Sequence, residues 1–154
     1  TYTPITGFTN SLTVYTGNEG TTAHTGGFTL VDYVGTYTLT PATTLALNAD
    51  YYNAEVAAND HSDAWGVAGY VNQKLDSANR IAVRAEYFKS DKDGFPLPAR
   101  NVKGVTATFG HALTDSFEVV AEARADFAGK GDPLFATHNQ DKQYIGTVRA
   151  VYKF

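Results

Sequence analysis

The C-terminal stretch Tyr144-Ile145-Gly146-Thr147-Val148-Arg149-Ala150-Val151-Tyr152-Lys153-Phe154 decides the predicted fold. Its even-numbered residues are apolar or aromatic, apart from one glycine, whereas its odd-numbered residues include Thr147, Arg149 and Lys153. In an extended chain, successive side chains point to opposite faces. The stretch therefore predicts a β-strand with one apolar face and one more polar face.

Seven further segments upstream show the same alternation. We predict eight strands, at residues 5–16, 24–39, 44–57, 64–74, 80–90, 100–113, 117–128 and 142–154. Three joints, at residues 40–43, 75–79 and 114–116, are short and rich in turn-forming residues. The other four, at residues 17–23, 58–63, 91–99 and 129–141, are mostly longer and more polar. This order is typical of an antiparallel up-and-down transmembrane β-barrel with short turns at one rim, so we predict an all-β fold of that kind.

Length and composition exclude several other classes. At 154 residues the chain matches a single domain, and its net charge of −4 with scattered basic residues argues against a nucleic-acid partner. The absence of cysteine excludes disulfides and thiolate chemistry. No run approaches the roughly 18 apolar residues of a membrane-spanning helix, but a barrel strand needs only about 9 to 11 residues, half of them apolar. Residue 1 is a threonine without a leader pattern, so we expect a processed or truncated chain.

Two details predict that the apolar faces contact lipid. Mid-strand apolar positions such as Ala85 and Ala123 are small, which suits flexible acyl chains better than a packed soluble core. Aromatic residues gather at both ends of the apolar faces, where amphipathic rings would meet lipid headgroups. We assign to these aromatic girdles Tyr51, Tyr87, Phe127 and Tyr144 near the long loops, and Phe117, Tyr152 and Phe154 near the short turns.

The polar faces carry charges of both signs. Side chains just fill the interior of an eight-stranded barrel, so charges enclosed there would need opposite partners. We therefore predict a structural charge network that fills the lumen, with water pockets and no open pore, in preference to an ion path. The predicted network comprises Asp32, Asp50, Arg84, Glu86, Glu118, Glu122, Arg124, Asp126, Arg149 and Lys153.

The terminal stretch also resembles the last strand of bacterial outer-membrane proteins, which ends in Phe after alternating apolar or aromatic residues. This resemblance implies that Tyr152 and Phe154 form a signal read by the barrel-assembly machinery. The stretch Arg84-Ala85-Glu86-Tyr87-Phe88-Lys89-Ser90-Asp91-Lys92-Asp93-Gly94-Phe95 resembles a strand and loop of β-barrel porins from Gram-negative bacteria. Together the resemblances imply an outer-membrane location, the lipid bilayer as partner, and long loops available to a protein partner outside the cell. Such porins are usually longer, so residues 1–154 form either one self-contained barrel domain or the C-terminal part of a larger barrel.

We expect no enzyme, no cofactor and no metal site. Asp91-Lys92-Asp93-Gly94 hints at a calcium loop, but glycine stands fourth instead of sixth and Val102 occupies the position of the bidentate glutamate. We interpret that segment as a solvated turn. The four histidines, His24, His61, His111 and His138, are too widely spaced to predict a metal site.

Two further features have a structural interpretation. His61-Ser62-Asp63 contains the residue types of a hydrolase triad, but neighbours on one loop seldom reach the geometry of nucleophile, base and orienting acid. We interpret this segment as a loop with hydrogen-bonding side chains, and the single tryptophan, Trp65, as an interfacial anchor.

Three functions follow from the sequence. The first is a small porin-like protein or membrane scaffold with a filled polar lumen. The second is the pore-forming part of a larger porin for small-solute diffusion and ion transport. The third is a soluble, lipocalin-like barrel that binds an apolar ligand, which alternation of period two does not by itself exclude.

Overall fold

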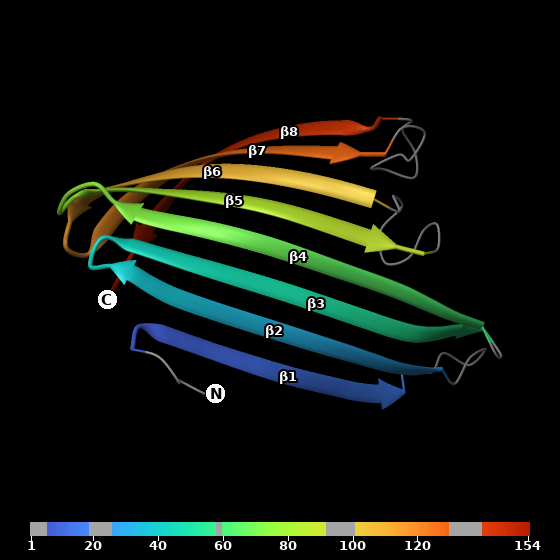
Figure 1. Ribbon diagram of the computed structural model, residues 1–154. Coiled ribbons are helices and arrows are strands. Elements are labelled where there is room, and N and C mark those ends of the chain that lie inside the picture. The colour runs from blue at the N-terminus through green and yellow to red at the C-terminus, as the bar shows by residue number, and fades with distance from the viewer. Residues whose placement is uncertain (1–5, 19–25, 58–59, 92–100, 130–139) are drawn as a thin grey trace.

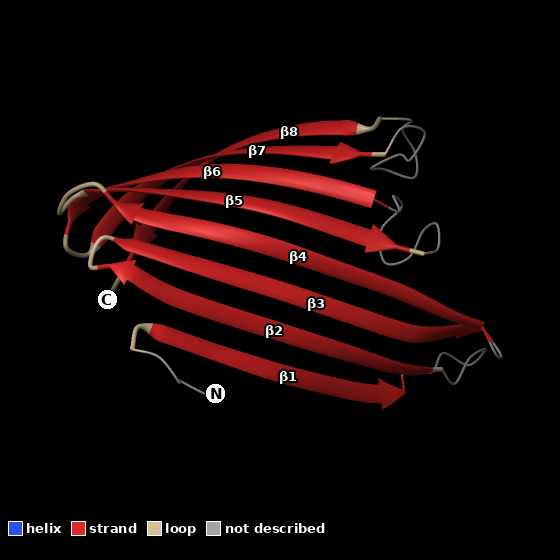
Figure 2. Cartoon of the chain, viewed as in Figure 1, coloured by secondary structure: helices blue, strands red, loops and turns tan. Residues whose placement is uncertain are grey.

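The computed structural model describes residues 6–18, 26–57, 60–91, 101–129 and 140–154 as one antiparallel sheet. Its eight strands pair in chain order, so each strand lies beside its sequence neighbours (Figure 1). The part of the chain that the structure describes consists of strands, turns and loops, and it has no helix long and apolar enough to span a membrane (Figure 2). The strands are β1 (Phe8–Asn18), β2 (Gly27–Thr40), β3 (Thr43–Ala57), β4 (Asp60–Lys74), β5 (Asn79–Ser90), β6 (Asn101–Thr114), β7 (Phe117–Ala128) and β8 (Lys142–Tyr152).

All eight predicted strands are found, but one predicted loop is wrong. Residues 58–63 were expected to form a loop, whereas β4 begins at Asp60 and pairs with β3 as far as Ala57. The polar composition of this segment resembles that of a loop, yet its backbone continues the hydrogen-bonded ladder, because strand formation depends on pairing more than on residue type. The predicted strand starts at residues 5, 24 and 100 lie outside the described residues.

The short turns gather at one rim, where β1 also begins and β8 ends (Figure 1). The turn between β2 and β3 is closed by Thr40, whose Oγ1 accepts hydrogen bonds from the backbone N–H groups of Ala42 at 3.2 Å and Thr43 at 2.9 Å. In the turn between β4 and β5, the Asp76 carboxylate accepts from the N–H groups of Ala78 and Asn79, both at 2.8 Å. These local bonds hold the hairpins that the turn-forming sequences predict.

The sheet is open, which corrects the prediction of a closed barrel. Among the described residues, β1 pairs only with β2 and β8 pairs only with β7, and the backbones of neighbouring strands alone lie close together. The hairpins join strands that are adjacent in sequence. Closure would instead need pairing between β1 and β8, which stand at opposite ends of the strand order and are not joined by a short turn.

The two faces of the sheet differ in composition and in exposure. On the face that we call the apolar face, large side chains such as Leu12, Val83 and Val148 are 65%, 46% and 75% exposed. The opposite face, which we call the polar face, is more shielded because its side chains cover one another. Among the residues whose burial is described, it carries all eight buried residues that have side chains: Ala54, Ser62, Ala64, Ala68, Ser90, Thr106, Val120 and Asp126.

Acidification is expected to loosen the turn between β4 and β5. The side-chain amide of Asn79, followed by the backbone N–H groups of Ala78 and Asn79, lowers the pKa of Asp76 below its usual 3.8. Because the pKa is lower in the folded state, the stabilisation is complete above the unfolded-state pKa and is lost as the pH falls through the lowered value. The measurement is NMR of the Ala78 and Asn79 amide signals against pH in detergent. Asp76→Asn is the control without a titrating carboxyl, and wild-type signals that do not move in acid would contradict the expectation.

Candidate functional site: the charged polar face

The polar face brings together every member of the predicted lumen network. Nine of the ten predicted residues point to this face, as the strand register and the alternation along each strand require. The tenth, Lys153, follows β8 and lines a cavity at the same face with Arg80 and Glu118. Two bases that the prediction omitted, Lys74 and Arg80, lie on the same face and oppose each other on β4 and β5. The charged groups of the face are therefore the acids Asp32, Asp50, Glu86, Glu118, Glu122 and Asp126, and the bases Lys74, Arg80, Arg84, Arg124, Arg149 and Lys153.

A chain of alternating charges runs from β5 to β7. Glu86 lies between two arginines, 2.5 Å from Nη2 of Arg124 and 3.3 Å from Nε of Arg84. Arg124 in turn donates from Nε to Oδ2 of Asp126 at 2.8 Å. The Asp126 side chain is only 8% exposed, and its Oδ1 has no hydrogen-bond partner among the described residues. Charges this poorly hydrated are stable only when paired. This series of ion pairs therefore holds β5 and β7 together across β6.

Two glycines of β6 make room for ion pairs that skip a strand. A Cβ added at Gly104 would lie 2.5 Å from Oε1 of Glu86 and 2.9 Å from Oδ1 of Asp126. A Cβ added at Gly110 would overlap the Glu118 carboxylate and lie 2.9 Å from Nε of Arg80. At both positions glycine has no side chain, and this leaves space above β6 in which a residue of β5 contacts a residue of β7.

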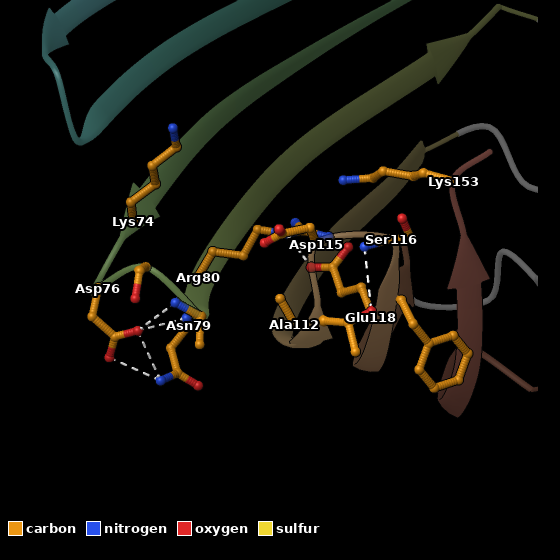
Figure 3. A pocket seen from close by; sticks show the side chains of 13 residues that line it. Lys74, Asp76, Asn79, Arg80, Ala112, Asp115, Ser116, Glu118 and Lys153 are labelled. Atoms are coloured by element: carbon orange, nitrogen blue, oxygen red, sulfur yellow. Dashed lines mark hydrogen bonds and ion pairs between the residues drawn. The ribbon is translucent and has the colours of Figure 1, made fainter.

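The second of these pairs lines a cavity at the short-turn rim. Nε of Arg80 donates to Oε1 of Glu118 at 2.6 Å across Gly110. Figure 3 shows Lys74 and Lys153 at the margins of the same cavity, which measures about 290 Å³. This end of the polar face therefore presents three cationic side chains, of which Arg80 is neutralised by an ion pair.

Not all predicted charges are paired in the described residues. Arg149 lies 3.8 Å from Oε2 of Glu122, which also accepts a hydrogen bond from Thr108 at 3.1 Å. Asp32 and Asp50 oppose each other on β2 and β3, and neither forms an ion pair with a described residue. Asn48 donates from its amide to Asp32 at 2.9 Å, which hydrogen-bonds the carboxylate without neutralising it. Lys153 likewise has no ion pair with a described residue, so the predicted pairing holds for only part of the network.

The charges are also sorted along the strands. Five bases and two acids lie within five residues of the short-turn ends, whereas four acids and one base lie farther toward the loops. The group near the turns is Lys74, Arg80, Arg84, Arg149, Lys153, Glu118 and Glu122. The group nearer the loops is Asp32, Asp50, Glu86, Asp126 and Arg124. The polar face is thus positive toward the turns and negative toward the loops.

The predicted aromatic girdles lie on the apolar face. At the loop end, Trp65 contacts Tyr87 with a ring separation of 5.2 Å, and Phe127 contacts Tyr144 edge-on at 6.2 Å. Tyr51 opposes Trp65, which extends this girdle to β3. At the turn end, the girdle residues Phe117 and Tyr152 oppose each other, and Phe154 follows at the exposed end of β8.

The hydrolase-like segment does not assemble a triad. His61 and Ser62 are adjacent in β4 and so point to opposite faces. The Ser62 side chain is fully buried, and its Oγ donates to Oδ1 of Asp91 at 2.9 Å. Asp63 accepts hydrogen bonds from Tyr51 and Asn53, both at 2.7 Å. These contacts tie β3, β4 and the end of β5 together, a network that the prediction of a loop had missed.

The remaining motifs are the calcium-like segment and the histidines. Residues 92–94 of the calcium-like segment, as well as His24 and His138, lie outside the described residues. In the described ranges, no three side chains of His, Asp or Glu gather as metal ligands. The place of Arg80 on the polar face could have been found from the sequence, because Arg80 has the same strand parity as Arg84 and Glu86. Its pairing with Glu118 and the role of the glycines depend on register.

One family comparison covers the entire chain. The model of the family described as "Putative beta-barrel porin-2, OmpL-like" matches residues 1–154. The chain belongs to this family, and the porin-like resemblance indicated by its sequence is confirmed. Comparisons with curated proteins and with solved structures gave no match.

Substituting Gly104 by alanine should break the ion pair between Glu86 and Arg124. The new methyl group would lie 2.5 Å from Oε1 of Glu86, so we expect the carboxylate to move away from Arg124, at a cost of about 1–3 kcal/mol. Urea unfolding of the protein in vesicles measures the loss. Gly69→Ala and Gly146→Ala are matched controls, because nothing lies within 4 Å of a Cβ at either position. If all three substitutions lowered the stability equally, the loss would come from replacing glycine by alanine in a strand and not from breaking the ion pair.

Proposed function

We propose that this chain forms the wall of an outer-membrane β-barrel porin, with its apolar face in lipid and its polar face lining a channel for small polar solutes. The observation that carries the proposal is the separation of side chains between the two faces. One face is apolar, exposed and bounded by aromatic girdles, and the other carries charges and is more shielded.

The distribution of charge on the apolar face supports membrane insertion. Within the described strands, its Asp, Glu, Lys and Arg residues all lie near the loop end, namely Glu55, Asp63, Lys89, Lys103 and Lys142. From there to the short turns, no such residue interrupts the face of these strands. The strands are 11 to 15 residues long, which suffices for the roughly 9 to 11 residues of a membrane crossing.

The shape of the sheet favours a channel over a filled lumen. Ion pairs on the polar face join strands at most two positions apart in the described sheet, and the backbones lie close together only between neighbouring strands. The side chains thus lie along the wall and do not interlock across it. Eight strands closed into a barrel would be nearly filled by side chains, so we infer that the channel wall includes further strands, from another copy or another part of the protein.

Paired edges are a requirement of this proposal. In hydrocarbon, the outer backbone groups of β1 and β8 would lack hydrogen-bond partners, and lipid supplies none. We expect both edges to be paired in the membrane. Tyr152 and Phe154, exposed at the end of β8, fit the role of an assembly signal that the resemblance to outer-membrane proteins implies.

A second candidate is a non-conducting membrane scaffold, which the network around Glu86 favours. Two arginines converge on this one carboxylate, and their neighbour Asp126 is nearly buried. If β1 paired with β8, the same groups would face one another across a narrow interior and block it. Channel recordings separate the two candidates.

A charge placed in the middle of the apolar face should prevent stable insertion. Val83→Arg puts a guanidinium where we infer acyl chains, at an expected cost of about 2–4 kcal/mol. Ala82→Arg is the matched control, since the adjacent residue points to the polar face. Folding yield and urea resistance in phosphatidylcholine vesicles provide the measurement. If folding yield and urea resistance fell equally in both variants, the apolar face would not be in contact with lipid.

Planar-bilayer recordings test the channel directly. We expect stable conductance steps from the refolded protein. Neutralising the two unpaired acids with Asp32→Asn and Asp50→Asn should shift the reversal potential toward anion preference, because their charge is not cancelled by a described ion pair. Lys74→Gln, which removes a base at the other end, should shift it toward cations. Absence of conductance from protein shown to be inserted would favour the scaffold and overturn the channel.

A further inference from the structure

Three lysines stand on the apolar face at its loop end, within the aromatic girdle. They are Lys89 on β5, Lys103 on β6 and Lys142 on β8, and all three are exposed. We propose that they form a binding site for the phosphate groups of anionic lipids in the leaflet at the loop rim. The site rests on the proposed insertion of the sheet in a membrane.

The register places the lysines close together. Lys103 and Lys142 flank the same residue, Phe127, so they are separated by two strand spacings, or about 10 Å. Lys89 opposes Asn101, two residues from Lys103, and is its diagonal neighbour at about 7–8 Å. Flexible lysine side chains at these separations can converge on one phosphorylated headgroup or bind two neighbouring ones.

The aromatic rings set the depth of the lysines. Lys103 opposes both Tyr87 and Phe127, and Lys89 opposes Trp65. Because tryptophan and tyrosine rings prefer the headgroup region, these positions are level with lipid headgroups in an inserted sheet. The apolar stems of the lysines can lie along the rings while their ammonium groups reach the phosphates.

Charge complementarity identifies the occupant. None of the three ammonium groups forms an ion pair with a carboxylate of the described residues. The acids at this end of the apolar face lie on β3 and β4. Asp63 is a diagonal neighbour of Lys89, but its carboxylate already accepts hydrogen bonds from Tyr51 and Asn53. At the turn end, the apolar face of the described strands carries no Lys, Arg, Asp or Glu. The surplus of positive charge is thus confined to one lipid interface.

The test compares lipid preference in the wild type and in the triple variant Lys89→Gln, Lys103→Gln, Lys142→Gln. Each protein is refolded into phosphatidylcholine vesicles that contain a trace of spin-labelled phosphatidic acid or spin-labelled phosphatidylcholine, and protein-bound label is measured by electron paramagnetic resonance. We expect the wild type to favour the anionic label, on the order of tenfold, and the triple variant to lose this preference. Lys74→Gln with Lys153→Gln is the control that removes positive charge from the polar face, and it should retain the preference.

The outcomes distinguish this site from the proposed function. Insertion is scored separately by protection from trypsin in both kinds of vesicle. If the wild type does not insert, the proposed function fails and this site fails with it. If the wild type inserts but shows no preference, or if the triple variant keeps the wild-type preference, the lysine site alone is overturned.

Discussion

The antiparallel hydrogen-bond ladder controls the placement of every side chain in the described sheet. Each paired residue must point to the same face as its partner on the neighbouring strand, so one register determines both faces at once. A shift of a single residue in β6 would move Gly104 and Gly110 to the apolar face and place Lys103 among the ion pairs. The separation of an apolar face from a polar face therefore depends on pairing that the three short turns hold in place.

The polar face shows how glycine position and charge position depend on each other. Arg80 and Glu118, like Glu86 and Arg124, lie on strands that do not pair, and they meet because β6 has no side chain at the level of contact. These ion pairs join β5 to β7 and therefore limit the movement of β5, β6 and β7 relative to one another. By contrast, Asp32 on β2 and Asp50 on β3 form no such ion pair with a base among the described residues.

Much of this arrangement could be predicted from the alternation of apolar and polar residues alone. Alternation places each side chain on one of the two faces of a strand, and this does not require knowledge of which strands pair. The strands, the girdle residues and ten of the twelve charged residues described on the polar face follow from it. The extension of β4 to Asp60 could not be predicted, since Ser62 and Asp63 have loop-like composition and their partners lie on β3 and at Asp91. The sequence left open whether the barrel closes on itself or belongs to a larger one, because a repeat of local hairpins carries no information about what pairs with β1 and β8.

The hairpin of β3 and β4 remains paired well past the girdle residue Tyr51, as far as Ala57 and Asp60. Six residues of continued strand correspond to roughly 20 Å, and Figure 1 shows this pair reaching farther than its neighbours at the loop rim. A paired ribbon has already lost most of its conformational freedom. Any molecule that docks on this ribbon therefore meets a preorganised surface and avoids much of the ordering cost that a loose loop would impose.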